Sequence, residues 1–357
     1  MDLELVWFGI VAIFWTGFFV LEGFDFGVGA LQVVVGKTDL ERRVAVNTVG
    51  PFWDGNEVWL VVAGASMFAA FPGWYATMFS ALYLALLLIL AALIVRGVSF
   101  EYRGKRDSER WRSTWTATLA VGSALLPLLI GIGLGDLIYG LPIDQSGEYT
   151  GSFLDLFTPF GLWVGLTLLA LTLLHGATFL ALRTTGLVHD RSRRLAVPFA
   201  VASFVAVAVF GVSTNALTDQ GLIPGPLHAS ALLAVVAAGW ATRSGRDGWA
   251  FIATTVAMAT SVLSIFVNLY PNLMVSSTDP AFSLTLTSTA SSAYALRVMT
   301  ITAAVFFPLV LLYQGWSFHV FRERIRGPSA KTPVAAGVDN GHLPPPNESG
   351  AGPTAIG

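Results

Sequence analysis

The chain has 357 residues, of which 54% are hydrophobic and 12% are charged, and its mean hydropathy is +0.68. Because about 25% of the residues in an average protein are charged, this composition indicates a polytopic membrane protein. The net charge of −2 gives no basis for nucleic-acid binding. The absence of cysteine excludes disulfides, thiolate metal sites, iron–sulfur clusters and CxxCH haem attachment.

Apolar runs of about 17 or more residues mark transmembrane helices. We identify nine runs, of which the seventh is the shortest, and predict an all-α protein with nine transmembrane helices. The first run follows acidic residues and is too long for a cleaved signal, so we expect it to be retained. The runs are Leu5–Val35, Val49–Phe71, Tyr75–Val98, Ser113–Leu134, Phe157–Leu182, Leu195–Leu217, Leu227–Ala241, Trp249–Leu269 and Val298–Val320.

Basic residues concentrate in every second connection. Nineteen of the 20 lie there or in the tail, and only Arg297 falls on the other side. By the positive-inside rule this predicts an outer N-terminus, a cytoplasmic C-terminus and an odd number of spans. The nineteen are Lys37, Arg42, Arg43, Arg96, Arg103, Lys105, Arg106, Arg110, Arg112, Arg183, Arg191, Arg193, Arg194, Arg243, Arg246, Arg322, Arg324, Arg326 and Lys331.

The C-terminal segment differs in composition from the rest of the chain. From Gly327 onward it is rich in Pro, Gly and Ala and has no apolar run that could pack. We therefore predict a transmembrane domain over residues 1–326 and a disordered cytoplasmic tail over residues 327–357.

Two pairs of carboxylates lie inside the first two spans. Glu22 and Asp25 are three residues apart on one helix face, and Asp54 and Glu57 repeat the spacing in the second span. Both pairs fall in the cytoplasmic half, where the two helices can meet. An ionisable residue in mid-span costs roughly 2.5–3.5 kcal/mol and usually marks an ion or proton path. The four acids therefore predict a proton route from the cytoplasm.

Packing is the alternative role for each acid taken alone. The carboxyl group would then be protonated or hydrogen-bonded, and Asp54 would stabilise a helix N-terminus. Neither of the two spans contains Lys or Arg, so we expect uncharged acids or a hydrated cavity.

Aromatic and histidine residues give weaker indications. His175 is the only histidine well inside a span, so we expect this chain to ligate neither haem nor another metal. Trp53, Trp59 and His175 are candidates for contact with a quinone or a partner. The alternatives are an interfacial aromatic belt for the tryptophans and an internally hydrogen-bonded core histidine.

Several segments together resemble subunit II of the cytochrome bd-type quinol oxidases. The most specific are GPFWDGNEVWLVVAGASMFAAFP at Gly50–Pro72 and LEGFDFGVGAL in the first span. The resemblance continues from the first span to the ninth and leaves only the tail outside. The further matching segments are Val98–Lys105, Pro159–Gly186, Asn268–Thr278, Ser283–Ser292 and Tyr313–Arg322.

The resemblance implies nine transmembrane helices, eight of them in two four-helix bundles, in the bacterial cytoplasmic membrane. It implies a partner, subunit I, that holds two b-type haems, haem d and the quinol-oxidising loop. The complex would oxidise quinol at the outer face and reduce dioxygen to water with cytoplasmic protons. This chain would carry no catalytic residue, and small accessory subunits and a structural quinone are further candidates.

Family resemblance also implies roles for individual residues. It makes Asp25 and Asp54 the proton-path residues of subunit II, with Glu22 and Glu57 as secondary candidates. A proton-coupled secondary transporter and a purely structural scaffold are the alternatives. Transporters often have broken helices at matched positions of two repeats, whereas these acids belong to one hairpin.

Overall fold

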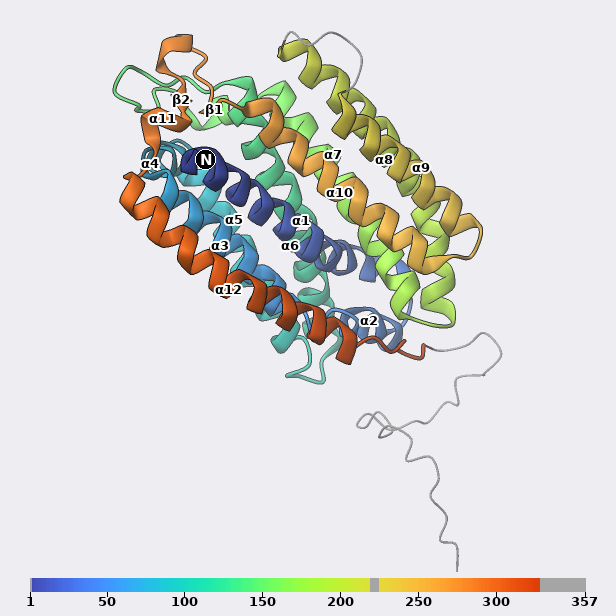
Figure 1. The fold of residues 1–357 in the computed structure, drawn as a ribbon. Helices are drawn as coiled ribbons and strands as arrows, with labels where there is room; N and C mark the ends of the chain where they lie inside the picture. Colours follow the sequence, from blue (N-terminus) through green and yellow to red (C-terminus); the bar gives the residue numbers. More distant parts are fainter. Residues whose placement is uncertain (1, 219–224, 328–357) are drawn as a thin grey trace, which may run out of the picture.

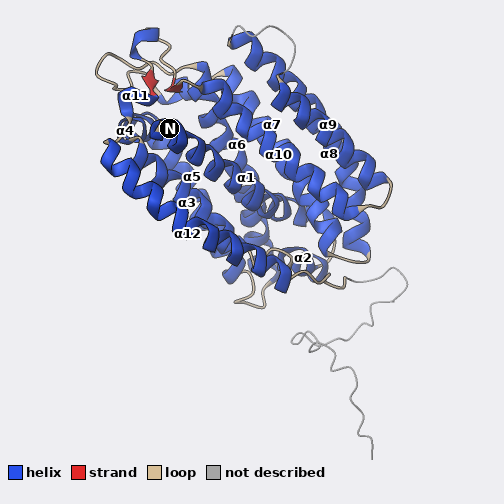
Figure 2. Cartoon of the chain, in the orientation of Figure 1, coloured by secondary structure: helices blue, strands red, loops and turns tan. Residues whose placement is uncertain are grey.

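The computed structural model describes residues 2–218 and 225–327, and these are almost entirely helical (Figure 2). The tail predicted to be disordered lies, from residue 328 on, outside the described residues. The helices are α1 (Leu3–Val35), α2 (Asp39–Asn47), α3 (Trp53–Ala70), α4 (Pro72–Ala81), α5 (Tyr83–Tyr102), α6 (Glu109–Tyr139), η1 (Phe153–Leu156), α7 (Pro159–Arg183), α8 (Leu187–Leu217), α9 (Pro226–Arg243), α10 (Asp247–Leu269), η2 (Pro280–Phe282), α11 (Leu286–Thr289) and α12 (Ala293–Val320). The strands are β1 (Asn272–Met274) and β2 (Leu284–Thr285), which pair antiparallel.

Helix α1 lies at the centre of the molecule (Figure 1). It packs against α3, α6, α7 and α10 and more lightly against α12. Its aromatic and aliphatic side chains are therefore buried along most of its length. This position explains why polar residues of α1 face other helices rather than the surroundings of the protein.

Small residues allow α1 and α7 to approach closely. A Cβ atom added at Gly27 would lie 2.7 Å from Gly176 Cα and would also collide with the carbonyl oxygen of Thr172. On the α6 side, a Cβ at Gly29 would collide with the hydroxyl of Ser123. Glycine at these two positions therefore allows α7 and α6 to pack closely against α1.

The other helices form two groups around α1. Helices α7, α8, α9 and α10 pack in a continuous ring of neighbours, and α5 and α3 lie with α6 and α1 on the other side. Helix α12 runs along the margin (Figure 1), where only 6% of its most apolar stretch is buried.

The predicted single span Tyr75–Val98 is wrong in detail, because the structure divides it into α4 and α5. Helix α4 begins at Pro72, a residue suited to the first helical turn. The helices meet at Leu82, whose N–H still donates to Met78 O at 2.9 Å. The path therefore bends at Leu82 without losing its backbone hydrogen bonds.

Seven helices of the described chain are long and apolar enough to cross a membrane: α1, α5, α6, α7, α8, α10 and α12. Helices α3 and α9 correspond to the second and seventh predicted spans, but each has only 18 residues. The first turns of α3 carry Asp54, Asn56 and Glu57, which lower its hydropathy.

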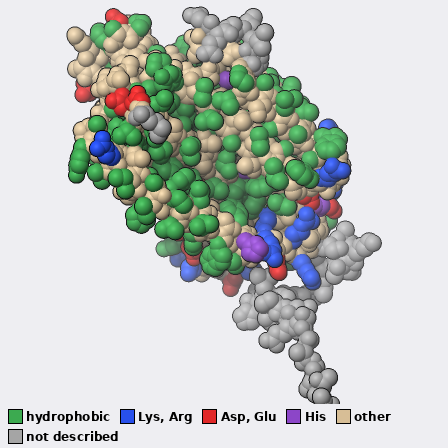
Figure 3. Space-filling view, in the orientation of Figure 1, with side chains coloured by type: hydrophobic (Ala, Val, Ile, Leu, Met, Phe, Trp, Pro, Cys, Tyr) green, Lys and Arg blue, Asp and Glu red, His purple; other side chains and the backbone are tan. Residues whose placement is uncertain are grey.

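Charged and apolar side chains separate on the visible surface (Figure 3). Hydrophobic side chains cover the flanks, and basic side chains gather mainly at the end where α2 lies. At the opposite end, β1, β2 and α11 form a cap (Figure 1). The segment after α6 is joined to this cap by a hydrogen bond of 3.0 Å from Leu141 N to Val275 O, next to β1. The long flanks are thus suited to lipid and the two ends to water.

Candidate functional site

Asp25 lies at the junction of three helices. Its side chain is fully buried in α1, and its Oδ2 accepts a hydrogen bond of 2.7 Å from Asn56 Nδ2 of α3. Asn56 Nδ2 also donates to Leu21 O at 3.1 Å, and Asn56 Oδ1 accepts from Gln314 Nε2 of α12 at 2.8 Å. Asn56 therefore fixes the position of the Asp25 carboxyl group.

A buried cation stands beside this junction. Arg96 of α5 is fully buried, and its Nη2 lies 2.6 Å from Glu22 Oε1, while its Nη1 lies 3.6 Å from Glu57 Oε2. Its Nε donates to Ser123 Oγ at 3.3 Å, and its guanidinium lies over the Phe26 ring at 4.7 Å. One arginine thus joins carboxylates from α1 and α3.

This arrangement corrects two expectations from the sequence. The sequence places Arg96 in a cytoplasmic connection and, with no Lys or Arg in the two spans of the acids, predicts uncharged acids or a hydrated cavity. Helix α5 in fact continues to Tyr102 and carries Arg96 into the interior, where it pairs with Glu22. The apolar context of Arg96, with LIV before it and GVSF after it, is the sequence signal for this position.

The four predicted acids do not all meet. Glu22, Asp25 and Glu57 gather around Arg96 and Asn56, whereas Asp54 is exposed in the first turn of α3. A carboxylate is stabilised there by the positive end of the helix dipole. Glu57 follows Asp54 by three residues on α3, is 22% exposed and reaches Arg96 at 3.6 Å. The acids therefore form a series from the surface to the interior.

Trp53 and Trp59 occupy different positions on α3. Trp53 stacks on Phe100 of α5 with ring centroids 4.8 Å apart. Trp59 is buried and packs edge-to-face against Phe14 and Phe307, at 6.1 and 6.2 Å. Both rings therefore pack against aromatic side chains of this chain.

His175 is held on both ring nitrogens. Its Nδ1 lies 2.7 Å from Thr254 Oγ1 and its Nε2 lies 3.1 Å from Val20 O, while Phe251 stacks on the ring at 4.7 Å. His228 also faces a hydroxyl, with its Nε2 3.2 Å from Ser264 Oγ. Across residues 2–218 and 225–327 no cluster of His, Asp or Glu is arranged to hold a metal ion. His175 and His228, whose ring nitrogens face groups of this chain, do not fit a pair of axial haem ligands.

Asp136, which is not among the residues predicted from the sequence, adjoins an apolar cavity. The cavity has a volume of about 550 Å³ and is lined by residues of α1, α3, α4, α5, α6 and η1, including Trp15, Leu86 and Phe157. Asp136 is fully buried, and its Oδ1 accepts from Thr158 Oγ1 at 2.6 Å. Its Oδ2 has no hydrogen-bond partner within the described chain. An acid at the end of the apolar run GIGLGD was the available signal.

Comparison with known proteins places these features in one family. The profile of the family described as cytochrome bd terminal oxidase subunit II matches residues 3–321. The chain belongs to this family. It is therefore a subunit of a terminal oxidase, which is an oxidoreductase complex.

Relatives of this subunit II cover nearly the whole chain. It is 40% identical to the cytochrome bd ubiquinol oxidase subunit 2 of Bacillus subtilis over 91% of this chain and 97% of that protein. It is 35% identical to the cytochrome bd-I ubiquinol oxidase subunit 2 of Escherichia coli K12, over 90% and 95%. A chain in the structure of the bd oxidase from Geobacillus thermodenitrificans shares the fold, with a TM-score of 0.71, 19% identity and coverage of 90% and 97%.

Proposed function

We propose that this chain is the haem-free second subunit of a cytochrome bd-type quinol oxidase in the bacterial cytoplasmic membrane. It stabilises the haem-bearing subunit I and supplies part of the route that brings cytoplasmic protons to the site of dioxygen reduction. The family membership and the relatives named as ubiquinol oxidase subunits support the assignment. Quinol and dioxygen are then substrates of the complex. Small accessory subunits are further candidate partners.

The topology that goes with this function has nine membrane-spanning helices. Besides the seven apolar helices, α3 and α9 would cross the membrane, because 18 residues extend about 27 Å at 1.5 Å per residue. Eight helices would form two four-helix bundles with α12 at the periphery. The basic residues at the α2 end support a cytoplasmic position for that end and for the C-terminus.

One observation carries the proton-route proposal: Asp25 and Glu22 are fully buried, while Glu57, which shares Arg96 with Glu22, is 22% exposed and follows the exposed Asp54 by three residues on α3. Asp54 would collect protons at the cytoplasmic end, and Glu57 would pass them to Glu22 and Asp25. The single guanidinium of Arg96 can neutralise only one carboxylate at a time. The remaining carboxyl groups can therefore hold protons in surroundings where charge is costly.

The haems and the structural quinone would be bound by different subunits of the complex. The two b-type haems and haem d would sit in subunit I and supply the redox chemistry, since the four histidines among the described residues already have polar partners within this chain. The apolar cavity beside Asp136 fits a structural quinone, because its lining suits a ring and isoprenoid chain and a protonated Asp136 carboxyl can donate a hydrogen bond to a quinone carbonyl oxygen. That quinone would stabilise the subunit.

The assignment is tested by purifying the chain together with the products of its native neighbouring genes. We expect a second multi-helix protein to co-purify and a reduced-minus-oxidised spectrum with b-type and d-type haem bands. A lone, colourless chain would contradict the oxidase proposal and favour the alternative, a proton-coupled secondary transporter. The scaffold alternative is tested by the variants of Asp54 and Asp25 described in the Discussion.

A further inference from the structure

A basic pocket lies at the end of the molecule where α8 begins and α9 ends. It has a volume of about 350 Å³ and is lined by three arginines and one acid. The lining residues are Asp190, Arg193, Arg194, Val197, Thr242 and Arg243. The pocket is separate from the carboxylate cluster around Arg96, which involves α1, α3 and α5.

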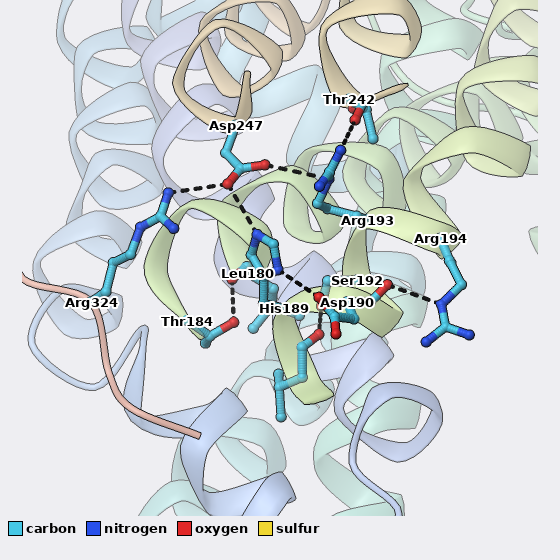
Figure 4. Close-up of polar contacts among 11 residues, drawn as sticks. Leu180, Thr184, His189, Asp190, Ser192, Arg193, Arg194, Thr242, Asp247 and Arg324 are labelled. Atoms are coloured by element: carbon cyan, nitrogen blue, oxygen red, sulfur yellow. Dashed lines mark hydrogen bonds and ion pairs between the residues drawn. The ribbon is translucent and has the colours of Figure 1, made fainter. Parts of the chain in front are cut away.

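Arg193 is fixed across the pocket wall (Figure 4). Its Nη2 donates to Thr242 O at 2.7 Å, and its Nε lies 3.7 Å from Asp247 Oδ1. Asp247 is in turn contacted by His189 and Arg324, each at 3.1 Å. The guanidinium of Arg193 is thus held in place before any ligand arrives.

The other two arginines form no ion pair with an acid of the described residues. Within residues 2–218 and 225–327, Arg194 donates one hydrogen bond, from its Nε to the main-chain oxygen of Asp190 at 3.3 Å. Arg243 is exposed and has no hydrogen bond or ion pair to another described residue. The only acid of the lining, Asp190, already contacts His189 Nδ1 at 3.0 Å. The pocket therefore attracts an anion.

The surface below the pocket is apolar. Val201 lies one turn beyond Val197 on α8, and Val236 and Trp240 lie on the α9 face that carries Arg243. These three side chains are 59%, 55% and 58% exposed. Arg246, in the turn after α9, lies over the Trp240 ring at 5.2 Å. A tryptophan covered by a cation is typical of the level where lipid headgroups meet acyl chains.

We propose that this pocket binds the phosphate of an anionic membrane lipid, with the acyl chains lying along the exposed faces of α8 and α9. Guanidinium groups match phosphate oxygens in a two-point geometry, and basic pockets between membrane helices bind phosphate headgroups. The apolar surface below favours a lipid over free phosphate. Only the placement of this end at the membrane surface rests on the function proposed above.

Binding is measured by native mass spectrometry of the whole oxidase complex in detergent, titrated with phosphatidylglycerol. We expect the wild-type complex to retain one lipid. The double variant Arg194→Gln/Arg243→Gln should bind it at least tenfold more weakly, because each arginine contributes about fivefold to the affinity. The matched control is Arg110→Gln/Arg112→Gln, which removes two basic residues at the exposed start of α6. Phosphatidylcholine and inorganic phosphate are titrated in parallel.

Three results would overturn the proposal. They are equal phosphatidylglycerol binding by the double variant and the wild type, an equal loss in the control variant, and binding of inorganic phosphate in preference to the lipid. Haem spectra and oxygen consumption of the same samples report on the oxidase assignment separately, so a failure of this site is distinguishable from a failure of that function.

Discussion

Arg96 Nη2 lies 2.6 Å from Glu22 Oε1, and both side chains are fully buried between α5 and α1. The same guanidinium reaches Glu57 at 3.6 Å and rests on Phe26. A buried ion pair adds little stability over an apolar pair of similar shape, but removing one partner leaves an unpaired charge that is costly. The pair therefore makes α5 necessary for keeping the acids of α1 and α3 in place.

Replacing Arg96 with leucine is expected to destabilise the complex by about 3–5 kcal/mol, because the buried Glu22 then loses the cation that pairs with it. Thermal unfolding of the purified complex measures the change. The double variant Arg96→Leu/Glu22→Leu should regain much of the loss. Arg112→Gln is the control, since its pair with Asp107 at 3.6 Å is exposed and is worth under about 1 kcal/mol. Equal stabilities for Arg96→Leu and Arg112→Gln would contradict a structural role of the buried pair.

Asp54→Asn is expected to lower oxygen consumption severalfold while the haem spectrum stays unchanged. Asp54 is exposed at the start of α3 and contacts none of the buried acids, so the fold does not depend on its charge. Its carboxylate would raise the local supply of protons at the entrance. Full activity in air-saturated buffer would remove Asp54 from the route.

Gly27→Ala is expected to destabilise the protein by about 1–3 kcal/mol, as overpacking does. The added Cβ would lie 2.7 Å from Gly176 Cα, and both residues belong to helices whose backbones are stiff. Gly9→Ala on the same helix has no atom within 4 Å of the new Cβ and should be neutral or slightly stabilising. The test compares the unfolding temperatures of Gly27→Ala and Gly9→Ala. Equal values would rule out close packing of α1 on α7.

Glu41 links α2 to the start of α8 and predicts a pH-dependent contribution to stability. Burial acts to raise the pKa of Glu41, but hydrogen bonds from Arg191 and from the Thr38 and Lys37 backbone outweigh it and hold the pKa below its ordinary value of 4.5. A carboxyl group with a lowered pKa stabilises the fold above its unfolded pKa, and this contribution is lost as the pH falls through the folded pKa.

The test compares Glu41→Gln with the wild type at pH 7 and at successive values below 4.5. We expect a loss of about 1.5–3 kcal/mol at pH 7, as for hydrogen bonds to a charged group, and a shrinking difference as the pH falls. Glu101→Gln, at an exposed position of α5, should show no such trend. A difference that stays constant over the whole pH range would mean that the carboxylate charge is not involved.

Much of the fold could be predicted from the apolar runs, because the length of a membrane helix is fixed by the bilayer. The ends of α1 and α10 agree with the predicted runs to within about two residues. The bend at Leu82 could not be predicted, since the apolar run passes through it without a break. Hydropathy indicates whether a segment lies in lipid or in water, and it does not indicate where its helix bends.

The candidate site was predicted in part. The acids are predictable because charge inside an apolar run is unusual, whereas Arg96 and Gln314 are not, because they come from helices far away in the sequence. Asn56 stands between Asp54 and Glu57, and only the helix rotation shows that the amide, rather than Asp54, faces Asp25. Partners contributed by other helices depend on tertiary packing, which a single sequence does not report.

The most direct test of the proton route is oxygen consumption by the purified complex carrying Asp25→Asn, with haem content measured on the same sample. Asparagine has the same shape and can still accept the hydrogen bond from Asn56, but it cannot hold a proton. We predict unchanged haem bands and a fall in turnover of about tenfold or more, with Glu101→Gln at the wild-type rate. Wild-type turnover in Asp25→Asn would contradict the account.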